Sequence, residues 1–510
     1  MMKNLSLPNS WVSCEIEDIL EAQSDGKLIH QGWSPQCEKV PAGLDEWGVL
    51  KTTAIQDGFF LEHENKRLPE SKEPKARIEV KNGDLLVTNA GPRARCGVIC
   101  FVQSTRNKLM ISGKMYRLRF PEGLICPEYI ESWLRTSFAQ KALNERKTGI
   151  SESGLNMTQA KFKTLPIVVA PFAEQKAITE KLETLLAQVE EAKARLESSL
   201  DTLKQFRQSV LAVAVSGRLT EDWRDAEVSN HLSFNSLKAL ESLKNKLIKD
   251  KLVKKDLLFQ LGEQQFSVPA DWHFVKLKSL ATKITDGEHK TPKRETTGRW
   301  LLSARNVRDG YISLDDVDYV GEEEYEKLRK RCDPQKGDVL ISCSGSVGRV
   351  SLVDKNDSYV MVRSAALIKT IDGHIHNRYL EYVLRSPMLQ KLIGESSKST
   401  AQANLFLGPI KELDIPLPSV AEQQEIVNRI EKLFAGADAS EQQVNQALER
   451  VNNLTQSILA KAFRGELTEQ WRKDNPELIS GENSAEALLE KIKTDRAAAK
   501  PKRKTRKKAE

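Results

Sequence analysis

The stretch 69–81 contains the residues of this chain that come nearest to a catalytic motif. It reads PESKEPKARIEVK, in which Glu70 precedes the group Glu79-Val80-Lys81, and this order loosely resembles the motif of a metal-dependent nuclease. In a chain with 29% charged residues, such a combination is expected by chance. A self-contained nuclease is therefore one alternative, and it depends on this stretch alone.

Other catalytic motifs do not occur in the sequence. The stretch GSVGRVS at Gly345 has glycines but neither the lysine nor the spacing of a phosphate-binding loop, so we interpret it as a turn between strands. There is no Asn-Pro-Pro-aromatic methyltransferase motif, because Asn475-Pro476 is followed by glutamate. His374-Ile375-His376 has no further metal ligand nearby. The sequence therefore predicts a chain without catalytic residues, metal or cofactor of its own.

Length and composition are those of a multidomain protein without membrane segments. The chain has 510 residues, of which 39% are hydrophobic, and it contains neither a run of 18 apolar residues nor a secretory signal. We therefore expect a cytoplasmic protein. Its seven cysteines are an odd number without a Cys-x-x-Cys pair, which favours reduced thiols packed mostly in cores.

The net charge of +7 comes from the end of the chain. Residues 491–510 contain ten lysines and arginines and two acidic residues, so the rest of the chain is close to neutral. Within that rest, residues 91–119 carry seven basic residues and no acid, and residues 273–308 carry nine basic residues and three acids. Basic residues among loop residues are typical of phosphate binding, because each neutralised phosphate releases counterions.

An internal repeat is the strongest pattern in the sequence. With an offset of 248 and no gap, residues 165–224 align with residues 413–472, and 21 of these 60 positions are identical. The alignment ends on LTEDWR at 219–224 and LTEQWR at 467–472. Weaker similarity upstream, such as GDLLVTNAG at Gly83 and GDVLISCSG at Gly337, extends the repeat to both halves of the chain. Each half therefore consists of a domain that differs between the two copies, followed by a repeated segment that is more similar between them.

The two repeated segments, residues 165–224 and 413–472, have the periodicity of long amphipathic helices. Apolar residues from Ile178 to Val213 alternate in steps of four and three, and the same phase recurs from Ile426 to Ile458. Prolines place the helix starts near Ala173 and Ala421, and Gly217 and Gly465 are at the expected ends. Because neither helix can bury its apolar stripe alone, we expect the two to pair antiparallel as a coiled coil.

The remaining segments have distinct compositions. The variable domains combine short β-branched runs with short helical runs and are predicted to be mixed α and β. The lysine-rich stretch after the first repeated segment is predicted to be helical and solvated, and the basic tail is predicted to be disordered. The predicted domains are residues 1–164, 165–224, 225–267, 268–412, 413–472 and 473–510.

Over nearly its whole length the chain resembles the DNA-specificity subunits of type I restriction-modification enzymes. The residues that carry the resemblance are NMTQAKFKTLPIVVAPFAEQKAI from Asn156, NLFLGPIKELDIPLPSVAEQQEI from Asn404 and TDGEHKTP from Thr285. The resemblance implies an α+β chain in which two mixed α/β target-recognition domains, 1–164 and 268–412, are separated by two antiparallel coiled-coil helices with pseudo-two-fold symmetry. The lysine-rich stretch and the basic tail are less typical of the family.

The resemblance also implies a function. The two domains would recognise an asymmetric, bipartite site in double-stranded DNA, with half-site spacing set by protein geometry. The subunit would perform no chemistry and would bind two methyltransferase subunits and restriction/translocase subunits. S-adenosylmethionine, ATP and Mg are expected in those partners, and no homo-oligomer is needed.

The basic runs and the repeated phrase contain the candidate contact residues. Arginine and lysine read guanine or hold phosphates, which makes basic residues in loops the candidates for DNA binding. The tryptophan of each LTE-x-WR phrase could pack on the helix pair or anchor a partner protein. The predicted DNA-binding residues are Arg93, Arg95, Lys290, Lys293, Arg305 and Arg349, and the predicted partner-binding residues are Trp223 and Trp471.

A non-enzymatic coiled-coil scaffold that binds nucleic acid without sequence preference is the main alternative. Such a scaffold would have no reason to contain two unlike copies of the same domain. The divergence of the two variable domains therefore favours sequence recognition over the scaffold.

Overall fold

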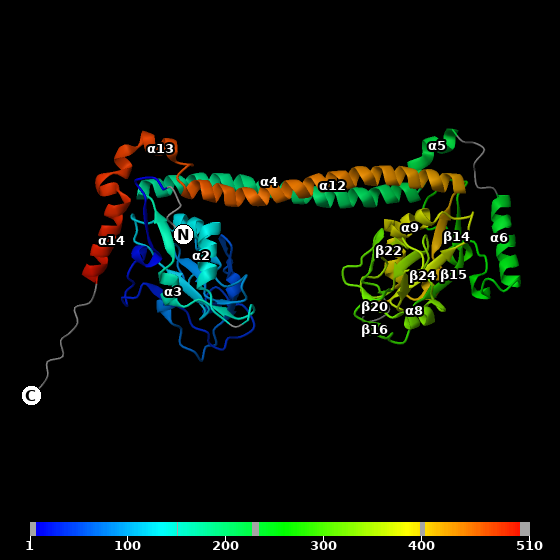
Figure 1. The fold of residues 1–510 in the computed structure, drawn as a ribbon, viewed down its shortest axis with the longest axis horizontal. Coiled ribbons are helices and arrows are strands. Elements are labelled where there is room, and N and C mark those ends of the chain that lie inside the picture. Colours follow the sequence, from blue (N-terminus) through cyan, green and yellow to red (C-terminus); the bar gives the residue numbers. More distant parts are fainter. Residues whose placement is uncertain (1–6, 150, 227–233, 398–402, 500–510) are drawn as a thin grey trace, which may run out of the picture. The chain divides into compact units, whose positions relative to one another are not determined.

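The computed structural model describes residues 7–149, 151–226, 234–397 and 403–499. The chain divides into two compact units, of which unit 1 comprises residues 1–196 and 446–510 and unit 2 comprises residues 197–445 (Figure 1). Each unit contains one α/β domain, which we call head 1 (residues 7–171) and head 2 (residues 260–419). Each unit also contains one half of each of two long helices.

Head 1 is organised around a four-stranded antiparallel sheet in the order β2-β11-β7-β9. The central strand β7 reads LLVT and is buried at all four positions, as expected of a strand covered on both faces. The strands of this sheet are β2 (Ile29–Gln31), β7 (Leu85–Thr88), β9 (Ile99–Phe101) and β11 (Met115–Leu118).

A second sheet in head 1 has the order β10-β3-β6, and shorter strand pairs join β1 to β13, β4 to β5 and β8 to β12. These strands are β1 (Val12–Glu15), β3 (Gly48–Leu50), β4 (Ile55–Gln56), β5 (Phe59–Phe60), β6 (Asn65–Arg67), β8 (Ala90–Gly91), β10 (Leu109–Met110), β12 (Leu155–Asn156) and β13 (Pro166–Val169). The helices of head 1 are α1 (Pro127–Leu134), α2 (Ser137–Arg146) and α3 (Gln159–Lys163), with 3-10 turns at η2 (Ile16–Ile19), η3 (Thr52–Ala54) and η4 (Ala76–Ile78).

Head 2 repeats this organisation. Its antiparallel sheet has the order β15-β24-β21-β22, and a second sheet has the order β16-β20-β17-β23. The strands are β14 (His273–Lys276), β15 (Ala281–Asp286), β16 (Arg294–Glu295), β17 (Arg299–Leu302), β18 (Val307–Arg308), β19 (Tyr311–Ile312), β20 (Asp318–Val320), β21 (Val339–Ser342), β22 (Val350–Leu352), β23 (Tyr359–Met361), β24 (Ala365–Thr370) and β25 (Asp414–Leu417). The helices are α7 (Leu277–Leu280), α8 (Glu322–Arg329), α9 (Asn377–Arg385), α10 (Pro387–Ser396) and α11 (Leu407–Lys411).

The first and last strands of each head pair with each other. In head 1, β1 runs antiparallel to β13, with Val12 opposite Val169. In head 2, β14 runs antiparallel to β25, with His273 opposite Leu417. Each head is therefore closed by the strand that leads directly into a long helix.

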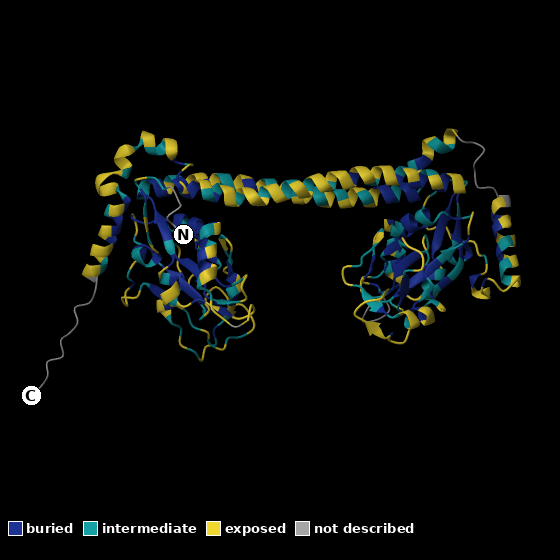
Figure 2. Cartoon of the chain, in the orientation of Figure 1, coloured by how far each residue is buried: buried dark blue, intermediate teal, exposed yellow. Residues whose placement is uncertain are grey.

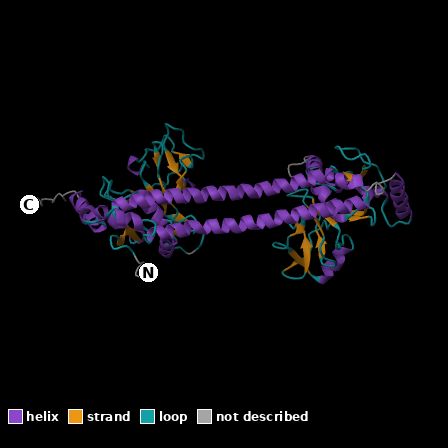
Figure 3. Cartoon of the chain, turned by 90° about the horizontal axis from the view of Figure 1, so that it is seen from above, coloured by secondary structure: helices purple, strands orange, loops and turns teal. Residues whose placement is uncertain are grey.

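The long helices are α4 (Phe172–Val215) and α12 (Val420–Phe463), each of 44 residues (Figure 3). Their starts lie within one residue of the predicted starts. Gly217 and Gly465 follow the helix ends with φ values of 76° and 78°, a left-handed conformation that glycine adopts without a Cβ clash. The predicted helix ends are thus confirmed.

In each unit the beginning of one long helix shares a core with the end of the other. Ile178 and Leu182 of α4 belong to the same core as Leu459 and Phe463 of α12 in unit 1. In unit 2, Leu211 of α4 and other residues near its end share a core with residues near the start of α12. In both units, therefore, residues near the start of one long helix and residues near the end of the other belong to one core.

The apolar seam is not fully buried, unlike the expectation from its periodicity. Phe206 is 39% exposed, Leu433 is 36% exposed and Leu454 is 47% exposed, and Figure 2 shows exposed positions along both long helices. A pair of helices buries the side of each helix that faces the other, so positions at the margin of the seam stay accessible to solvent.

The segments after the long helices correct two predictions. The lysine-rich stretch was expected to be solvated, but α6 (Phe234–Lys249) buries Leu237, Leu240 and Lys244 against head 2. The tail was expected to be disordered from residue 473, but residues up to 499 form helices, and α14 (Ala485–Ala499) buries Leu488 and Ile492 in the core of head 1. Residues 500–510 of the tail lie outside the described residues. The other elements are η5 (Arg218–Thr220), α5 (Glu221–Ala226), η7 (Lys255–Leu257), α13 (Glu469–Asp474), η8 (Pro476–Ile479) and η9 (Gly481–Asn483).

Candidate nucleic-acid interface

A buried glutamate at the start of each long helix joins each head to the helix pair. In unit 1, Glu174 accepts hydrogen bonds from Nε1 of Trp11 at 2.8 Å, the hydroxyl of Thr468 at 2.6 Å and the guanidinium of Arg472 at 2.5 Å. The carboxylate is fully buried. Because Thr468 and Arg472 belong to the LTEQWR phrase, this phrase closes head 1 onto the end of α12.

Unit 2 has the same junction. Glu422 accepts hydrogen bonds from Nε1 of Trp272 at 2.9 Å, Thr220 at 2.7 Å and Arg224 at 2.5 Å. Thr220 and Arg224 belong to the LTEDWR phrase. The repeated phrase is therefore explained by an intramolecular junction, in which one copy of the phrase binds the glutamate of the other copy's AEQ motif.

A proline completes each junction. A Cβ added to Gly465 would lie 2.4 Å from Cγ of Pro8, and one added to Gly217 would lie 2.5 Å from Cδ of Pro269. Glycine is therefore required at both helix ends for its left-handed φ and for this close approach. We call the two arrangements junction 1 (around Glu174) and junction 2 (around Glu422).

Four loops of head 1 meet around Asn89, at the end of β7. The backbone N–H of Asn89 donates to the carbonyl of Lys114 at 3.0 Å, and its own carbonyl accepts from Met157 at 2.9 Å. Trp33 donates to the carbonyl of Ile111 at 3.1 Å, which brings in a further loop. We call residues 32–36, 90–97, 112–114 and 151–157 loop cluster 1.

Equivalent loops of head 2 meet around Cys343, at the end of β21. Its N–H donates to the carbonyl of Ser364 at 2.7 Å, and its carbonyl accepts from Leu405 at 2.8 Å. The backbone N–H of Glu288 donates to the carbonyl of Met361 at 2.9 Å. We call residues 287–293, 303–306, 344–349, 362–364 and 403–405 loop cluster 2. Both clusters lie where strands end in loops, which suits them to contact a ligand as large as DNA.

A glycine permits the close strand approach in each cluster. A Cβ on Gly32 would lie 2.0 Å from the carbonyl oxygen of Ile111, and one on Gly287 would lie 2.0 Å from that of Met361. No side chain fits at this distance from backbone. Gly287 belongs to the TDGEHKTP stretch, so the structure gives a steric reason for one of its residues.

The two arginines chosen in head 1 differ in their environment. Arg93 is half-exposed on the loop between β8 and β9, and its guanidinium is paired with Glu152 at 2.5 Å. Arg95 points inward, where it donates to the carbonyls of Thr52 and Ile55 and to Gln56. Arg93 is therefore accessible to a ligand that displaces Glu152, whereas Arg95 holds its loop against the neighbouring strand.

The residues chosen in head 2 all lie in loop cluster 2. Lys290 and Lys293 are exposed, and among the described residues neither ammonium group has a hydrogen-bond or ion-pair partner. The same holds for the partly exposed guanidinium of Arg349. Arg305 is half-exposed and pairs with Asp316 at 3.3 Å and Asp318 at 2.9 Å. The structure brings these four residues to one loop cluster and leaves three of their charges without a partner among the residues that it describes.

Two exposed cations of the loop clusters were not chosen from the sequence. Lys114 lies in the turn before β11, and Arg363 lies in the turn before β24, which are equivalent turns of the two heads. Neither side chain has a hydrogen-bond or ion-pair partner among the residues that the structure describes. The register of the two sheets makes Lys114 equivalent to Ser364, so the two cations lie one residue apart in equivalent turns. A cation in this turn of both heads is the signal that could have found them.

One acidic side chain at the edge of loop cluster 2 is held ionised by its neighbours. Burial acts to raise the pKa of Asp286, but hydrogen bonds from Arg331 at 2.7 Å and His289 at 2.8 Å outweigh burial and lower it below its usual value. Asp286 directly precedes Gly287. The carboxylate is thus neutralised by its own neighbours.

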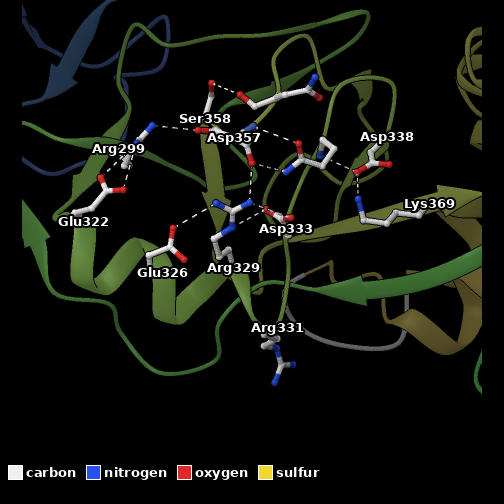
Figure 4. A network of polar contacts seen from close by, with 12 residues as sticks. Arg299, Glu322, Glu326, Arg329, Arg331, Asp333, Asp338, Asp357, Ser358 and Lys369 are labelled. Carbon is white, nitrogen blue, oxygen red and sulfur yellow. Dashed lines mark hydrogen bonds and ion pairs between the residues drawn. The ribbon is translucent and has the colours of Figure 1, made fainter. Parts of the chain in front are cut away.

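Elsewhere in head 2 the arginines are fully engaged in a network of ion pairs. Arg329 pairs with Glu326, Asp333 and Asp357, and Arg299 pairs with Glu322 (Figure 4). Figure 4 also shows Arg331 directed away from this network. The network offers no unpaired positive charge to a phosphate, in contrast to loop cluster 2.

The described parts of the chain hold neither a candidate metal centre nor a candidate membrane span. They contain no group of three or more His, Cys, Asp or Glu residues that could hold a metal ion, and no helix both long and apolar enough to cross a membrane. Glu79, of the nuclease-like stretch, accepts a hydrogen bond from the backbone N–H of Lys108 at 2.8 Å. Burial raises the pKa of the Cys126 thiol to about 11, so this thiol is protonated at neutral pH.

Comparison with known proteins gives one family model and several relatives. Residues 269–450 match the family described as "Type I restriction modification DNA specificity domain". The chain is 40% identical over 370 residues to the type I restriction enzyme EcoBI specificity subunit of Escherichia coli, and the match covers 72% of each chain. It is 38% identical over 395 residues to the EcoKI specificity subunit of Escherichia coli strain K12, with 76% of each chain covered.

A solved structure has the same fold. It is reported as the structural basis of complex assembly and conformational transition of the type I R-M system. The match has a TM-score of 0.61 and 19% sequence identity, and covers 90% of this chain and 99% of that chain.

Proposed function

The chain belongs to the family of type I restriction enzyme specificity subunits, and on that premise we propose that head 1 and head 2 each read one half of a two-part DNA site. A subunit of this family sets the DNA sequence specificity of a type I restriction-modification system. It is the non-catalytic subunit, and catalysis lies in its partner subunits. The nuclease alternative is therefore wrong, and the scaffold alternative is not favoured.

One observation carries the proposal of two half-sites. Loop clusters 1 and 2 are built on equivalent hydrogen bonds around Asn89 and Cys343, yet their loops differ in length and charge. The loop after β8 runs from Gly91 to Gly97, whereas the equivalent turn runs only from Gly345 to Gly348. Two equivalent sites with different contact residues should read two different sequences.

Within each cluster we assign roles by exposure and charge. Lys290, Lys293, Arg349 and Arg363 are the proposed DNA contacts of head 2, and Arg93 and Lys114 are those of head 1. Lysine ammonium groups act mainly on phosphates, and arginine can also bind guanine through two hydrogen bonds. Arg95 positions the loop of Arg93, and Arg305 would reach DNA only by leaving its two aspartates.

We further propose that α4 and α12 form an antiparallel coiled coil that separates the two target-recognition domains. A helix of 44 residues is roughly 66 Å long at 1.5 Å per residue. The bases between the half-sites would then not be read. The duplicated junctions support a pseudo-two-fold arrangement, because each head is fixed to helix ends by the same contacts.

The partly exposed helix seam is the proposed docking surface for the methyltransferase. In unit 2 an apolar groove of about 710 Å³ is lined by residues including Leu203, Phe206, Leu219 and Leu433. The repeat places Val451, Leu454, Leu467 and Leu185 at the equivalent positions of unit 1. Two such surfaces support two methyltransferase subunits. Trp223 and Trp471, both half-buried, follow Leu219 and Leu467 by four residues and extend each surface.

The partner subunits would supply everything that the reactions consume. S-adenosylmethionine is expected on the methyltransferase subunits, and ATP and Mg on the restriction/translocase subunits. This chain would contribute only selection of the site.

Methylation sequencing of DNA tests the two-part site. Cells that express the chain with its methyltransferase should methylate one motif made of two short specific parts with unread bases between them. Exchange of residues 91–97 for the loop of a relative should change one part only. A contiguous motif, or a change in both parts, would contradict the proposal.

Copurification tests the docking surface. Changing Phe206 and Leu433 to serine should weaken methyltransferase binding at the unit 2 surface, with the methylated sequence retained. Tyr311, which is 60% exposed in head 2, provides a control when changed to serine. Full retention of both methyltransferase subunits by the Phe206 and Leu433 variant would place the docking surface elsewhere.

A further inference from the structure

The lysine-rich segment after the first LTE-x-WR phrase is fixed against head 2. Leu237 and Leu240 of α6 are buried there, and the ammonium group of Lys244 is buried and donates to the carbonyls of Lys278, at 2.8 Å, and Ala281. Val253 and Leu257 are buried as well. The segment 234–257 is therefore a fixed wall beside head 2.

A strongly basic groove of about 1010 Å³ lies between this wall and head 2. Residues 248 and 251–257 form one side, and residues of β15, the end of α8, β24 and α11 form the other. Eight cationic side chains line the groove, against two carboxylates, Asp256 and Asp286. The cationic residues are Lys251, Lys254, Lys255, Lys283, Lys330, Arg331, Lys369 and Lys411.

Three of these cations are paired with carboxylates. Lys411 pairs with Asp256 at 2.6 Å, Arg331 pairs with Asp286 at 2.7 Å, and Lys369 pairs with Asp338. Lys283 donates to the carbonyl of Arg331 at 2.8 Å. Both acids of the groove are therefore already neutralised.

Four lysines of the groove remain available to a ligand. Lys251, Lys254, Lys255 and Lys330 are exposed, and within the described parts of the chain their ammonium groups have no hydrogen-bond or ion-pair partner. Three come from the linker wall, and Lys330 follows α8 on the opposite wall. Positive charge converges from both sides of the groove.

Lys251 occupies an unusual backbone position. Its φ is 59°, in the left-handed region, at the point where α6 ends and where glycine or asparagine is common. A lysine there costs roughly 1 kcal/mol relative to glycine. A strained residue that lines a charged groove is a reason to look for a function.

The groove is continuous with loop cluster 2. Asp286 and Thr285 line the groove, and Gly287, the next residue, begins the cluster. His289, within the cluster, contacts Asp286 at 2.8 Å. A duplex held at loop cluster 2 can therefore place its backbone in this groove.

We propose that this groove binds the sugar–phosphate backbone of the DNA next to the half-site read by head 2. The inference rests on the proposed function, because it takes head 2 to be a reader of double-stranded DNA. Lysines suit this role because they bind phosphates as flexible point charges and carry no sequence information. The groove lining contains no aromatic side chain on which unpaired bases could stack, which favours a duplex over a single strand.

Beside α14 of unit 1, the described residues form a cavity of different character. The cavity along α14 is lined by one lysine, Lys491, and one acid, Glu482, with mainly apolar and neutral neighbours.

Salt-dependent binding of the chain in complex with its methyltransferase tests the proposal. The triple variant Lys251→Gln, Lys254→Gln and Lys255→Gln is measured on two duplexes, one with the recognised sequence and one with the half-site of head 2 scrambled. Each phosphate contact contributes about 0.9 to the slope of log affinity against log salt, so the slope should fall by about 2 to 3. At about 0.1 M salt the affinity should fall between roughly tenfold and a few hundredfold, equally on both duplexes.

Two further variants make the test specific. Lys330→Gln, on the opposite wall, should lower the slope by about 0.9 alone and add to the triple variant. The matched control changes three exposed lysines of head 2 outside the groove to glutamine, namely Lys336, Lys355 and Lys391. This control should leave the slope unchanged.

An unchanged slope in the triple variant, or equal losses in variant and control, would overturn the proposal. Loss of methyltransferase from the complex with an unchanged slope would also overturn it and would make the groove a protein-binding site. The methylated sequence separates this test from the proposed function. If only the groove proposal is wrong, the methylated motif still has two parts. If the proposed function is wrong, the methylated motif is contiguous even with the wild-type chain.

Discussion

The buried glutamates of junctions 1 and 2 accept hydrogen bonds from the same three residue types, whereas loop clusters 1 and 2 match only in their backbone. Glu174 and Glu422 each bind a tryptophan, a threonine and an arginine at distances that differ by no more than 0.1 Å. The loop clusters share the hydrogen bonds around Asn89 and Cys343 but differ in loop length and in exposed charge. A buried carboxylate tolerates few changes, because removal of any partner leaves a charge unpaired. Exposed loop side chains have no such constraint and can diverge.

The largest expected effect comes from breaking the matched junctions. Changing Glu174 or Glu422 to leucine removes a buried carboxylate from a largely buried arginine, whose side chain is 14% or 11% exposed, and each change should lower the free energy of unfolding by about 3–5 kcal/mol. Calorimetric melting of both variants measures this loss, which should be equal in the two units. Glu431→Leu, at an exposed site of α12, should stay within about 0.5 kcal/mol of wild type. Unequal losses would show that the junctions are not equivalent.

The next effect distinguishes the two loop clusters. Gly32→Ala and Gly287→Ala each force a Cβ against a carbonyl oxygen, which should destabilise the head by about 1–3 kcal/mol and displace its loops. In methylation sequencing, each variant should relax or lose one half of the motif and keep the other. Gly408, with open space around it, is the control when changed to alanine. Loss of both halves from either change would contradict separate reading.

A pH-dependent effect distinguishes the helices that pack against the two heads, α6 on head 2 and α14 on head 1. Burial lowers the pKa of Lys244 to about 8, so between about pH 8 and its ordinary value of 10.5 the unfolded chain binds this proton more tightly than the folded chain. The stability of unit 2 should therefore gain a contribution as pH rises through this window. Arg496 donates to the carbonyls of Glu17 and Asp18 in unit 1, and an arginine stays protonated there.

Melting temperatures at pH 7.5 and pH 10 measure this contribution in wild type and in Lys244→Met. The wild type should gain stability relative to the variant at the higher pH, and one pKa unit corresponds to about 1.4 kcal/mol. The variant Arg496→Met should change stability by the same amount at both pH values. A parallel pH response of wild type and Lys244→Met would exclude Lys244 as the source.

The smallest effect on stability is expected at the tryptophans of the repeated phrase. Trp223 and Trp471 are half-buried and take no part in the hydrogen bonds of junctions 1 and 2, so changing either to alanine should alter the free energy of unfolding by less than about 1 kcal/mol. Coelution with the methyltransferase should weaken, and the methylated sequence should not change. If coelution is unaffected, the two tryptophans only pack at the helix ends.

Several features of this protein were determined by sequence alone. Heptad spacing predicts long paired helices, and Gly217 and Gly465 end them where predicted because a left-handed residue is needed there. The repeat predicts two equivalent heads, and the AEQ and LTE-x-WR phrases mark the segments that hold them. These properties follow from local periodicity and from the comparison of two copies within one chain.

Only the tertiary structure decided what individual charges do. Arg93 and Arg95 are two residues apart, yet one is exposed and the other donates to the backbone carbonyls of Thr52 and Ile55, which are distant in sequence. Lys244 belongs to a lysine-rich stretch expected to be solvated, and it is buried because two carbonyls of head 2 accept hydrogen bonds from its ammonium group. A charged side chain can satisfy its hydrogen bonds from water or from a neighbouring segment. Which of the two it uses depends on contacts between residues far apart in the chain, and periodicity carries no information about them.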